Sequence, residues 1–251
     1  GSITINNPIN TAGITSVTLG TGNFVAGDTA GDSIVSGGNY NTLVGSAAGT
    51  ATTTGDYNSA LGRNALGSNT TGASNVAVGR NTMFTNTTAS NNTAVGDSAL
   101  YANTTGTQNT AVGMSALLAA TTGGYNTVMG YLAGSAITTG SGNAFFGLRA
   151  GAGTTTGTAN TFVGGSSNSY AGYANTTGTN NTAVGSDALA ANTTASNNTA
   201  VGMDALTANT TGTLNTATGS QSLDANTTGN SNTASGHQAL TSNTTADNNT
   251  A

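Results

Sequence analysis

The sequence predicts an all-β fold, a parallel β-solenoid (β-roll) in which each 17-residue repeat forms one coil. Three observations predict it. A sequence motif recurs at a fixed period, and its glycines are too closely spaced for helices of three turns. At two positions of the repeat, a large side chain at one is always accompanied by a small one at the other. Solenoid coils of this kind bury their apolar sides against their neighbours.

The repeat starts with Asn and has Gly four residues later, beginning at Asn41 and recurring every 17 residues. One interval, from Asn160 to Asn181, has four extra residues. The consensus is N-T-A-V-G-x-x-A-L-x-A-N-T-T-G-x-x, with positions numbered one to seventeen. The predicted organisation is an N-terminal cap or linker at 1–22 and a solenoid at 23–251, which comprises a degenerate first coil 23–40, twelve repeats 41–248 and a truncated coil 249–251.

The elements of one coil follow from residue types along the repeat. In the first full repeat we expect a strand at 41–44, a corner at 45–47, a second strand at about 48–54 and a corner at 55–57. Glycine at positions five and fifteen supplies the backbone angles of the corners. Three repeats have Ala at fifteen, and all three have Asn at seventeen, which tolerates the left-handed conformation. The four extra residues are predicted at a corner, near 166–169.

Positions three and nine vary together in size. In eight repeats position nine is Leu or Met and position three is Ala. The other four repeats reverse the pattern, with Gly at position nine: Leu43 with Gly49, Val128 with Gly134, Phe145 with Gly151, and Phe162 with Gly172. Voids and overfilled cores are both unfavourable. The two positions are therefore predicted to share one space inside the coil.

Position four is apolar in ten consecutive coils. Its residues are Val44, Leu61, Val78, Val95, Val112, Met129, Phe146, Val163, Val184 and Val201. If position three faces inward, strand alternation sends position four outward. A continuous exposed apolar column indicates an interface, and rotational symmetry would let identical columns from several chains meet on an axis. The alternative is that a twisted strand tucks position four into its own core.

Charge and composition argue against several functions. The chain has eight Asp, three Arg, one His and no Cys, Glu or Lys, for a net charge of -5. So few cations disfavour nucleic acid and anionic lipid as partners, and no apolar run is long enough to insert into a membrane. The Asp residues are scattered singly, which supports neither an enzyme nor a metal site. No cofactor is expected.

Exposed aromatic and charged residues are the candidates for receptor contact. They are Phe84 and Tyr101 at position ten, Arg80, Tyr131 and Arg149 at corners, Ser166, Asn168 and Tyr170 in or beside the insertion, and Tyr173 just after it. Aromatic faces suit sugar rings, but stacked aromatics also stabilise solenoids without any ligand. The recurrent Asn and Thr are predicted to form hydrogen-bonded ladders between coils. Asn at position twelve (Asn69, Asn86, Asn103) and Thr at position fourteen (Thr71, Thr88, Thr105) would give two outward columns, which is the basis of an ice-binding alternative.

The phrase NTAVG resembles the head repeats of trimeric autotransporter adhesins, and NTAVGxxALxANTTG is similar to repeat regions of bacteriophage tail fibres. The resemblance covers Asn41 to Ala251. It implies a left-handed β-roll assembled as a homotrimer, located on a virion tail fibre or a bacterial cell surface. The repeat is longer than that of the adhesin heads, and the sequence contains neither a coiled-coil stalk nor a membrane anchor. Tail fibres of this kind often carry a C-terminal chaperone domain that is cleaved off. Because the sequence stops three residues into a coil, whose pairing groups would be left exposed, we expect the chain to continue beyond Ala251 or another chain to stack there.

The sequence therefore predicts a non-enzymatic trimeric attachment fibre that binds a glycan or protein receptor on a host surface. The alternatives are a purely structural extracellular filament or spacer and, less favoured, an ice-binding solenoid.

Overall fold

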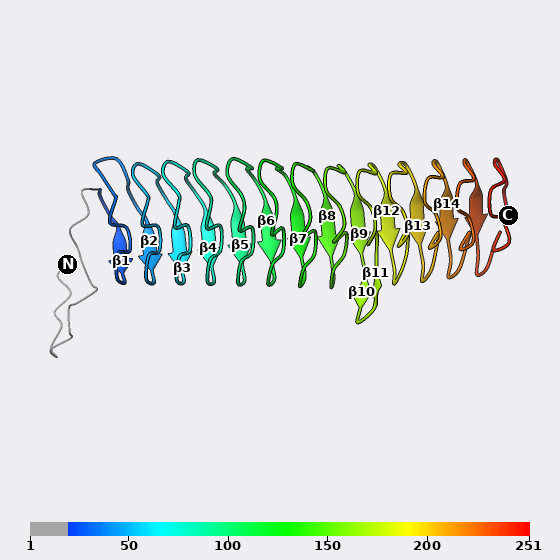
Figure 1. Cartoon of the computed structure of the whole chain (residues 1–251), viewed down its shortest axis with the longest axis horizontal. Coiled ribbons are helices and arrows are strands. Elements are labelled where there is room, and N and C mark those ends of the chain that lie inside the picture. Colours follow the sequence, from blue (N-terminus) through cyan, green and yellow to red (C-terminus); the bar gives the residue numbers. More distant parts are fainter. Residues whose placement is uncertain (1–19) are drawn as a thin grey trace.

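The computed structural model describes residues 20–251, and the segment predicted as an N-terminal cap or linker lies almost entirely outside them. The described residues form a parallel β-solenoid of about twelve turns with about 17 residues per coil, and they contain no helix. The coils stack side by side into an elongated body (Figure 1). The all-β solenoid predicted from the repeat is confirmed.

Each coil contributes one three-residue strand, from positions two to four, to a single parallel sheet of 13 strands. Their bounds are β1 Phe24–Ala26, β2 Thr42–Val44, β3 Ser59–Leu61, β4 Val76–Val78, β5 Thr93–Val95, β6 Thr110–Val112, β7 Thr127–Met129, β8 Ala144–Phe146, β9 Thr161–Val163, β12 Thr182–Val184, β13 Thr199–Val201, β14 Thr216–Thr218 and β15 Thr233–Ser235. Successive strands pair in register, so that Ala94 lies opposite Ala111 in the next coil. Equal positions therefore form straight columns along the solenoid.

The second predicted strand, at positions eight to fourteen, is wrong. That part of the coil is a series of turns, because positions seven and nine are left-handed: Ser98 has a φ of 56° and Leu100 a φ of 51°. A left-handed residue breaks the extended path of a strand. Neighbouring coils are still joined there by backbone hydrogen bonds, such as the 2.9 Å bond that Leu100 N donates to Ala116 O.

The two corner glycines have different roles. Gly96, at position five, has a φ of 134°, which side chains rarely adopt. Gly106, at position fifteen, does not have a positive φ, and the left-handed residue of this corner is position seventeen, where Gln108 has a φ of 59°. The expectation that Gly at fifteen supplies a special backbone angle is therefore wrong. A Cβ at Gly106 would instead meet the backbone of Gly123 in the next coil, so close approach of the two coils favours glycine.

Positions three and nine share one space, as their sizes predict. A Cβ built on Gly49 would lie 2.8 Å from the Leu43 side chain of the same coil. The same relationship holds for Gly151 and the Phe145 ring, and for Gly172 and the Phe162 ring. Gly134 differs, because a Cβ there would meet Phe145 of the following coil and Ile137 of its own, each at 3.2 Å. The core is therefore packed between coils as well as within them.

Asn at position one forms a buried ladder along the solenoid. The amide of Asn92 donates to Gly106 O at 3.0 Å, while its oxygen accepts from the backbone N of Asn109 at 2.9 Å. At position thirteen the hydroxyl of Thr104 donates to Thr121 O in the next coil at 3.1 Å. The predicted ladders are confirmed at these positions.

Asn at position twelve faces inward, so the prediction of an outward column there is wrong. Asn69, Asn86 and Asn103 are fully buried, and the amide of Asn86 donates to the Asn69 oxygen at 2.8 Å. The ladder is interrupted where Ala120 occupies position twelve, and the Asn103 Oδ1 then has no hydrogen-bond partner among the described residues. It resumes at Asn175, whose oxygen accepts from the Asn192 amide at 2.8 Å. Buried amides are stable only when they are paired, and the inward column supplies those pairs. Thr at position fourteen is exposed, as predicted.

Candidate functional site

The four extra residues form a hairpin that projects from the solenoid. Strands β10 (Gly165–Ser166) and β11 (Ser169–Tyr170) pair antiparallel directly after β9 (Figure 1). The hydroxyl of Tyr170 donates to Ser167 O at 2.8 Å, which closes the loop. Strand β9 still pairs with β12 in register, so the insertion at the predicted corner leaves the sheet continuous.

Three of the predicted contact residues converge at the base of this hairpin. The guanidinium carbon of Arg149 lies 5.6 Å from the centroid of the Tyr170 ring, which is a cation–π arrangement. The Tyr170 and Tyr173 rings are tilted at 39° to each other with centroids 5.2 Å apart. The backbone N of Tyr170 donates to the Asp187 carboxylate at 2.9 Å and ties the hairpin to the following coil. Residues from three successive coils thus form one cluster.

An open hollow of about 440 Å³ lies beside this cluster. Its lining residues are Leu132, Ser135, Arg149, Ala152, Gly153, Tyr173, Ala174 and Thr176. The hollow exists because position ten, which carries Leu118 and Tyr173 in the flanking coils, is reduced to Ser135 and Ala152 between them. Ser135 and Ala152 were not among the predicted contact residues, because a small side chain in one coil gives no sign of a hollow until the coils are stacked.

Phe84 and Tyr101 form a separate aromatic pair several coils away. Their rings are stacked, with centroids 5.6 Å apart and an angle of 23° between the planes. Both are half-buried at position ten of adjacent coils. The two rings therefore cover each other. This arrangement fits the alternative in which stacked aromatics stabilise the solenoid without binding a ligand.

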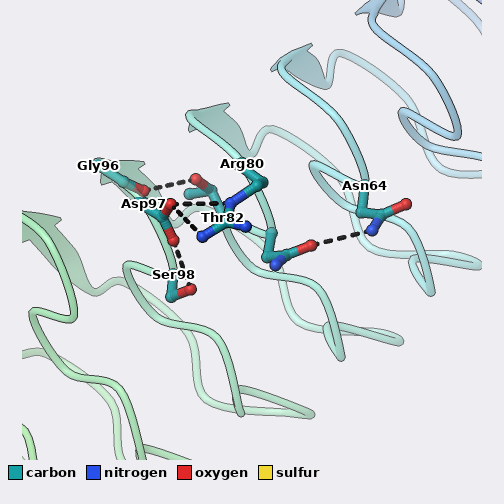
Figure 2. A network of polar contacts seen from close by, with 7 residues as sticks. Asn64, Arg80, Thr82, Gly96, Asp97 and Ser98 are labelled. Carbon is teal, nitrogen blue, oxygen red and sulfur yellow. Dashed lines mark hydrogen bonds and ion pairs between the residues drawn. The ribbon is translucent and has the colours of Figure 1, made fainter.

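Arg80 is paired with Asp97 of the next coil. Its Nη2 lies 2.8 Å from Asp97 Oδ2, and Figure 2 shows the two side chains pointing toward each other across the corner. The Asp97 carboxylate also accepts a 2.7 Å hydrogen bond from Ser98 Oγ. The Ser98 bond first, and the Arg80 bond second, hold the pKa of Asp97 below its usual range. Because its donors are engaged by Asp97, Arg80 is a poorer candidate for ligand binding than Arg149.

The remaining predicted contact residues are accessible, and one of them neighbours the cluster, since the backbone N of Arg149 donates to Tyr131 O at 2.9 Å. Ser166 and Asn168 are exposed in the hairpin, and Tyr131 is exposed at position six. Sequence reasoning missed Tyr40 and Tyr57, the last residues of two successive coils, whose exposed rings stack with centroids 5.3 Å apart. Their 17-residue spacing is the signal that would have found them.

The apolar column at position four lies at the surface. Each of its ten residues is half-buried or exposed, with 52% of Leu61 and 42% of Met129 accessible. None of them belongs to the buried core, so the alternative that this column is tucked inside is wrong. Position six adds exposed apolar side chains in the same part of the coil, including Met114 and Tyr131.

No protein family, curated protein or solved structure matches this chain. Within residues 20–251 there is no group of three or more His, Cys, Asp or Glu that could hold a metal ion. The same part of the chain has no helix of the length and apolarity needed to cross a membrane.

Proposed function

We propose that this protein is a segment of a homotrimeric attachment fibre, with left-handed coils, located on the surface of a virion or a bacterial cell. Its task is to present a rigid solenoid surface to a glycan or protein receptor on a host. The proposal extends the resemblance of the NTAVGxxALxANTTG repeat to tail fibres and adhesin heads.

The observation that carries the proposal is the surface position of the apolar column from Val44 to Val201. Ten coils at a spacing of about 4.8 Å make a column nearly 50 Å long. Exposed apolar surface of that extent is unfavourable in water and is typical of a protein interface. Because equal positions form straight columns, three copies related by a threefold axis would bring identical side chains together along the whole length.

A purely structural filament or spacer remains the second candidate, since the same regular stacking suits a rod. Electron microscopy separates the two, because the attachment fibre gives discrete particles of uniform length and the filament gives long continuous fibres. The ice-binding alternative has lost one of its two columns, because Asn at position twelve is buried. We expect no thermal hysteresis.

The test of the proposal is the mass of the full chain in solution by light scattering, followed by binding of the labelled protein to a panel of candidate host cells. A mass of three chains with saturable binding to some cells supports it. A monomer would contradict the trimer, and a trimer that binds none of the cells would favour the spacer.

A further inference from the structure

The hollow beside the hairpin has the size and lining of a small ligand site. Its volume of about 440 Å³ falls within the range of roughly 300–1,000 Å³ that is usual for such sites. Small residues, Ala152 and Gly153 among them, line it, while Tyr173 and Arg149 contribute a ring and a cation. Apolar surface with a few convergent polar groups is the common composition of ligand pockets.

Arg149 gives the site its selectivity for charge. The guanidinium makes no hydrogen bond or ion pair with any residue in 20–251, and its neighbour is the uncharged ring of Tyr170. The Asp187 carboxylate does not pair with Arg149, because it accepts a hydrogen bond from the backbone N of Tyr170. The planar fork of an arginine binds a carboxylate through two parallel hydrogen bonds. An anionic group on a ligand would therefore find free donors here.

Tyr173 and two hydroxyls suit a sugar ring. The Tyr173 side chain is 43% exposed, and its ring face can stack against the C–H face of a pyranose. The Ser135 hydroxyl has no partner within the described part of the chain and can donate or accept. The Thr176 hydroxyl donates to Thr193 O at 2.9 Å and can still accept from a ligand.

We infer that this hollow binds an acidic sugar unit, a pyranose ring that carries a carboxylate, within a receptor glycan. The carboxylate pairs with Arg149, the ring stacks on Tyr173, and the sugar hydroxyls bind Ser135 and Thr176. This inference rests on the proposed function, because it names the receptor chemistry of the attachment fibre.

The test compares two ligands that differ only in the carboxylate, methyl glucuronide and methyl glucoside. Each is titrated against the full chain at millimolar concentrations, with saturation-transfer NMR and calorimetry as readouts. Loss of a charge-assisted pair corresponds to about tenfold or more in affinity. We therefore expect the glucuronide to bind at least about tenfold more tightly than the glucoside.

Arg149→Ala should remove this preference. The variant is expected to fold, because Ala47 occupies the same repeat position with a φ of 56°, close to the 52° of Arg149. The matched control is Arg63→Ala, which removes a second exposed arginine in a distant coil and should leave binding unchanged. Tyr173→Ala should weaken both glycosides, while Tyr125→Ala, which removes another exposed tyrosine, should weaken neither.

Equal affinity for the two glycosides, no binding of either, or full glucuronide affinity in Arg149→Ala would overturn the inference. The proposed function is judged separately. A chain that is trimeric and attaches to cells equally well with and without Arg149 keeps its role as an attachment fibre and refutes the acidic-sugar site. A chain that binds glucuronide but is monomeric and attaches to no cell keeps the site and refutes the fibre.

Discussion

The ring of Phe145 occupies the space that a side chain at Gly151 would fill. Gly151 has a φ of 59°, close to the 51° at which Leu100 is found at the same repeat position. A leucine is therefore absent from Gly151 because the volume is already taken, and the backbone conformation there is one that leucine adopts in other coils. The two residues therefore form a matched pair, in which the large side chain of Phe145 fills the space left free at Gly151.

Phe145→Ala should lower the free energy of unfolding by roughly 3–5 kcal/mol, because it leaves a cavity and removes the stacking on Phe162. Adding Gly151→Leu should restore a large part of this loss by filling the same space. Gly151→Leu alone should destabilise the protein, since its side chain would meet the Phe145 ring. Chemical denaturation of the three variants measures these effects. Absence of rescue in the double variant would mean that the two positions do not share one cavity.

Aspartate substitutions in the position-four column should break the proposed trimer. Val95→Asp with Val112→Asp places two charges on adjacent coils of the proposed interface, where burying them without partners is unfavourable. We expect the mass by light scattering to fall from three chains to one. Thr218→Asp is the matched control, since position four is already polar and exposed in that coil. The column would not be the interface if Thr218→Asp also dissociated the trimer, or if the double valine variant remained trimeric.

The buried Asn ladder should be sensitive to a single deletion. Asn92→Ala leaves the Asn109 N–H and the Gly106 carbonyl without the partners that Asn92 provides. Each buried group left without a partner costs about 1–3 kcal/mol, so the free energy of unfolding should fall by roughly 2–6 kcal/mol. Thr105→Ala, at an exposed position with no hydrogen bond from its side chain, should change stability little. Thermal unfolding of both variants measures the two losses of stability. If Asn92→Ala and Thr105→Ala destabilised the protein equally, the Asn ladder would have no special role.

The Arg80–Asp97 pair should contribute a small stability that depends on pH. Because the pKa of Asp97 is lowered in the folded state, the contribution is present above the unfolded pKa of about 3.9 and is lost as pH falls through the lower folded value. Asp97→Asn should therefore be slightly less stable than the unmodified chain at neutral pH, by no more than about 1 kcal/mol for so exposed a pair. Urea titrations at several pH values measure the difference, which should disappear in strong acid. A constant difference across pH would assign the effect to packing.

The sequence predicts the repeating coil and its core residues better than it predicts the backbone conformation in the second half of each coil. Reciprocal volumes at Phe145 and Gly151 identify the inside because packing acts directly on side-chain size. The turns at positions eight to fourteen are not predicted, since the left-handed conformation of Leu100 is unusual for its residue type and leaves no mark in composition. The inward amide of Asn86 is missed for a related reason, because alternation along a second strand does not apply to a chain of turns.

The candidate site is predicted only in its parts. The insertion draws attention to Tyr170 and Tyr173, and charge draws attention to Arg149. Their convergence depends on two successive coils being stacked in register, and the hollow depends on two small residues, Ser135 and Ala152, whose type alone does not mark a site. The sequence gives no reason to separate Arg149 from Arg80, because pairing with Asp97 is a property of the folded corner.

The pairing of β9 with β12 across the hairpin has a consequence for engineering. A corner that tolerates four added residues without shifting the columns on either side is a natural grafting point. Because the corresponding corner recurs in every coil, foreign peptides could be displayed at chosen heights along one rigid rod, in steps of about 4.8 Å.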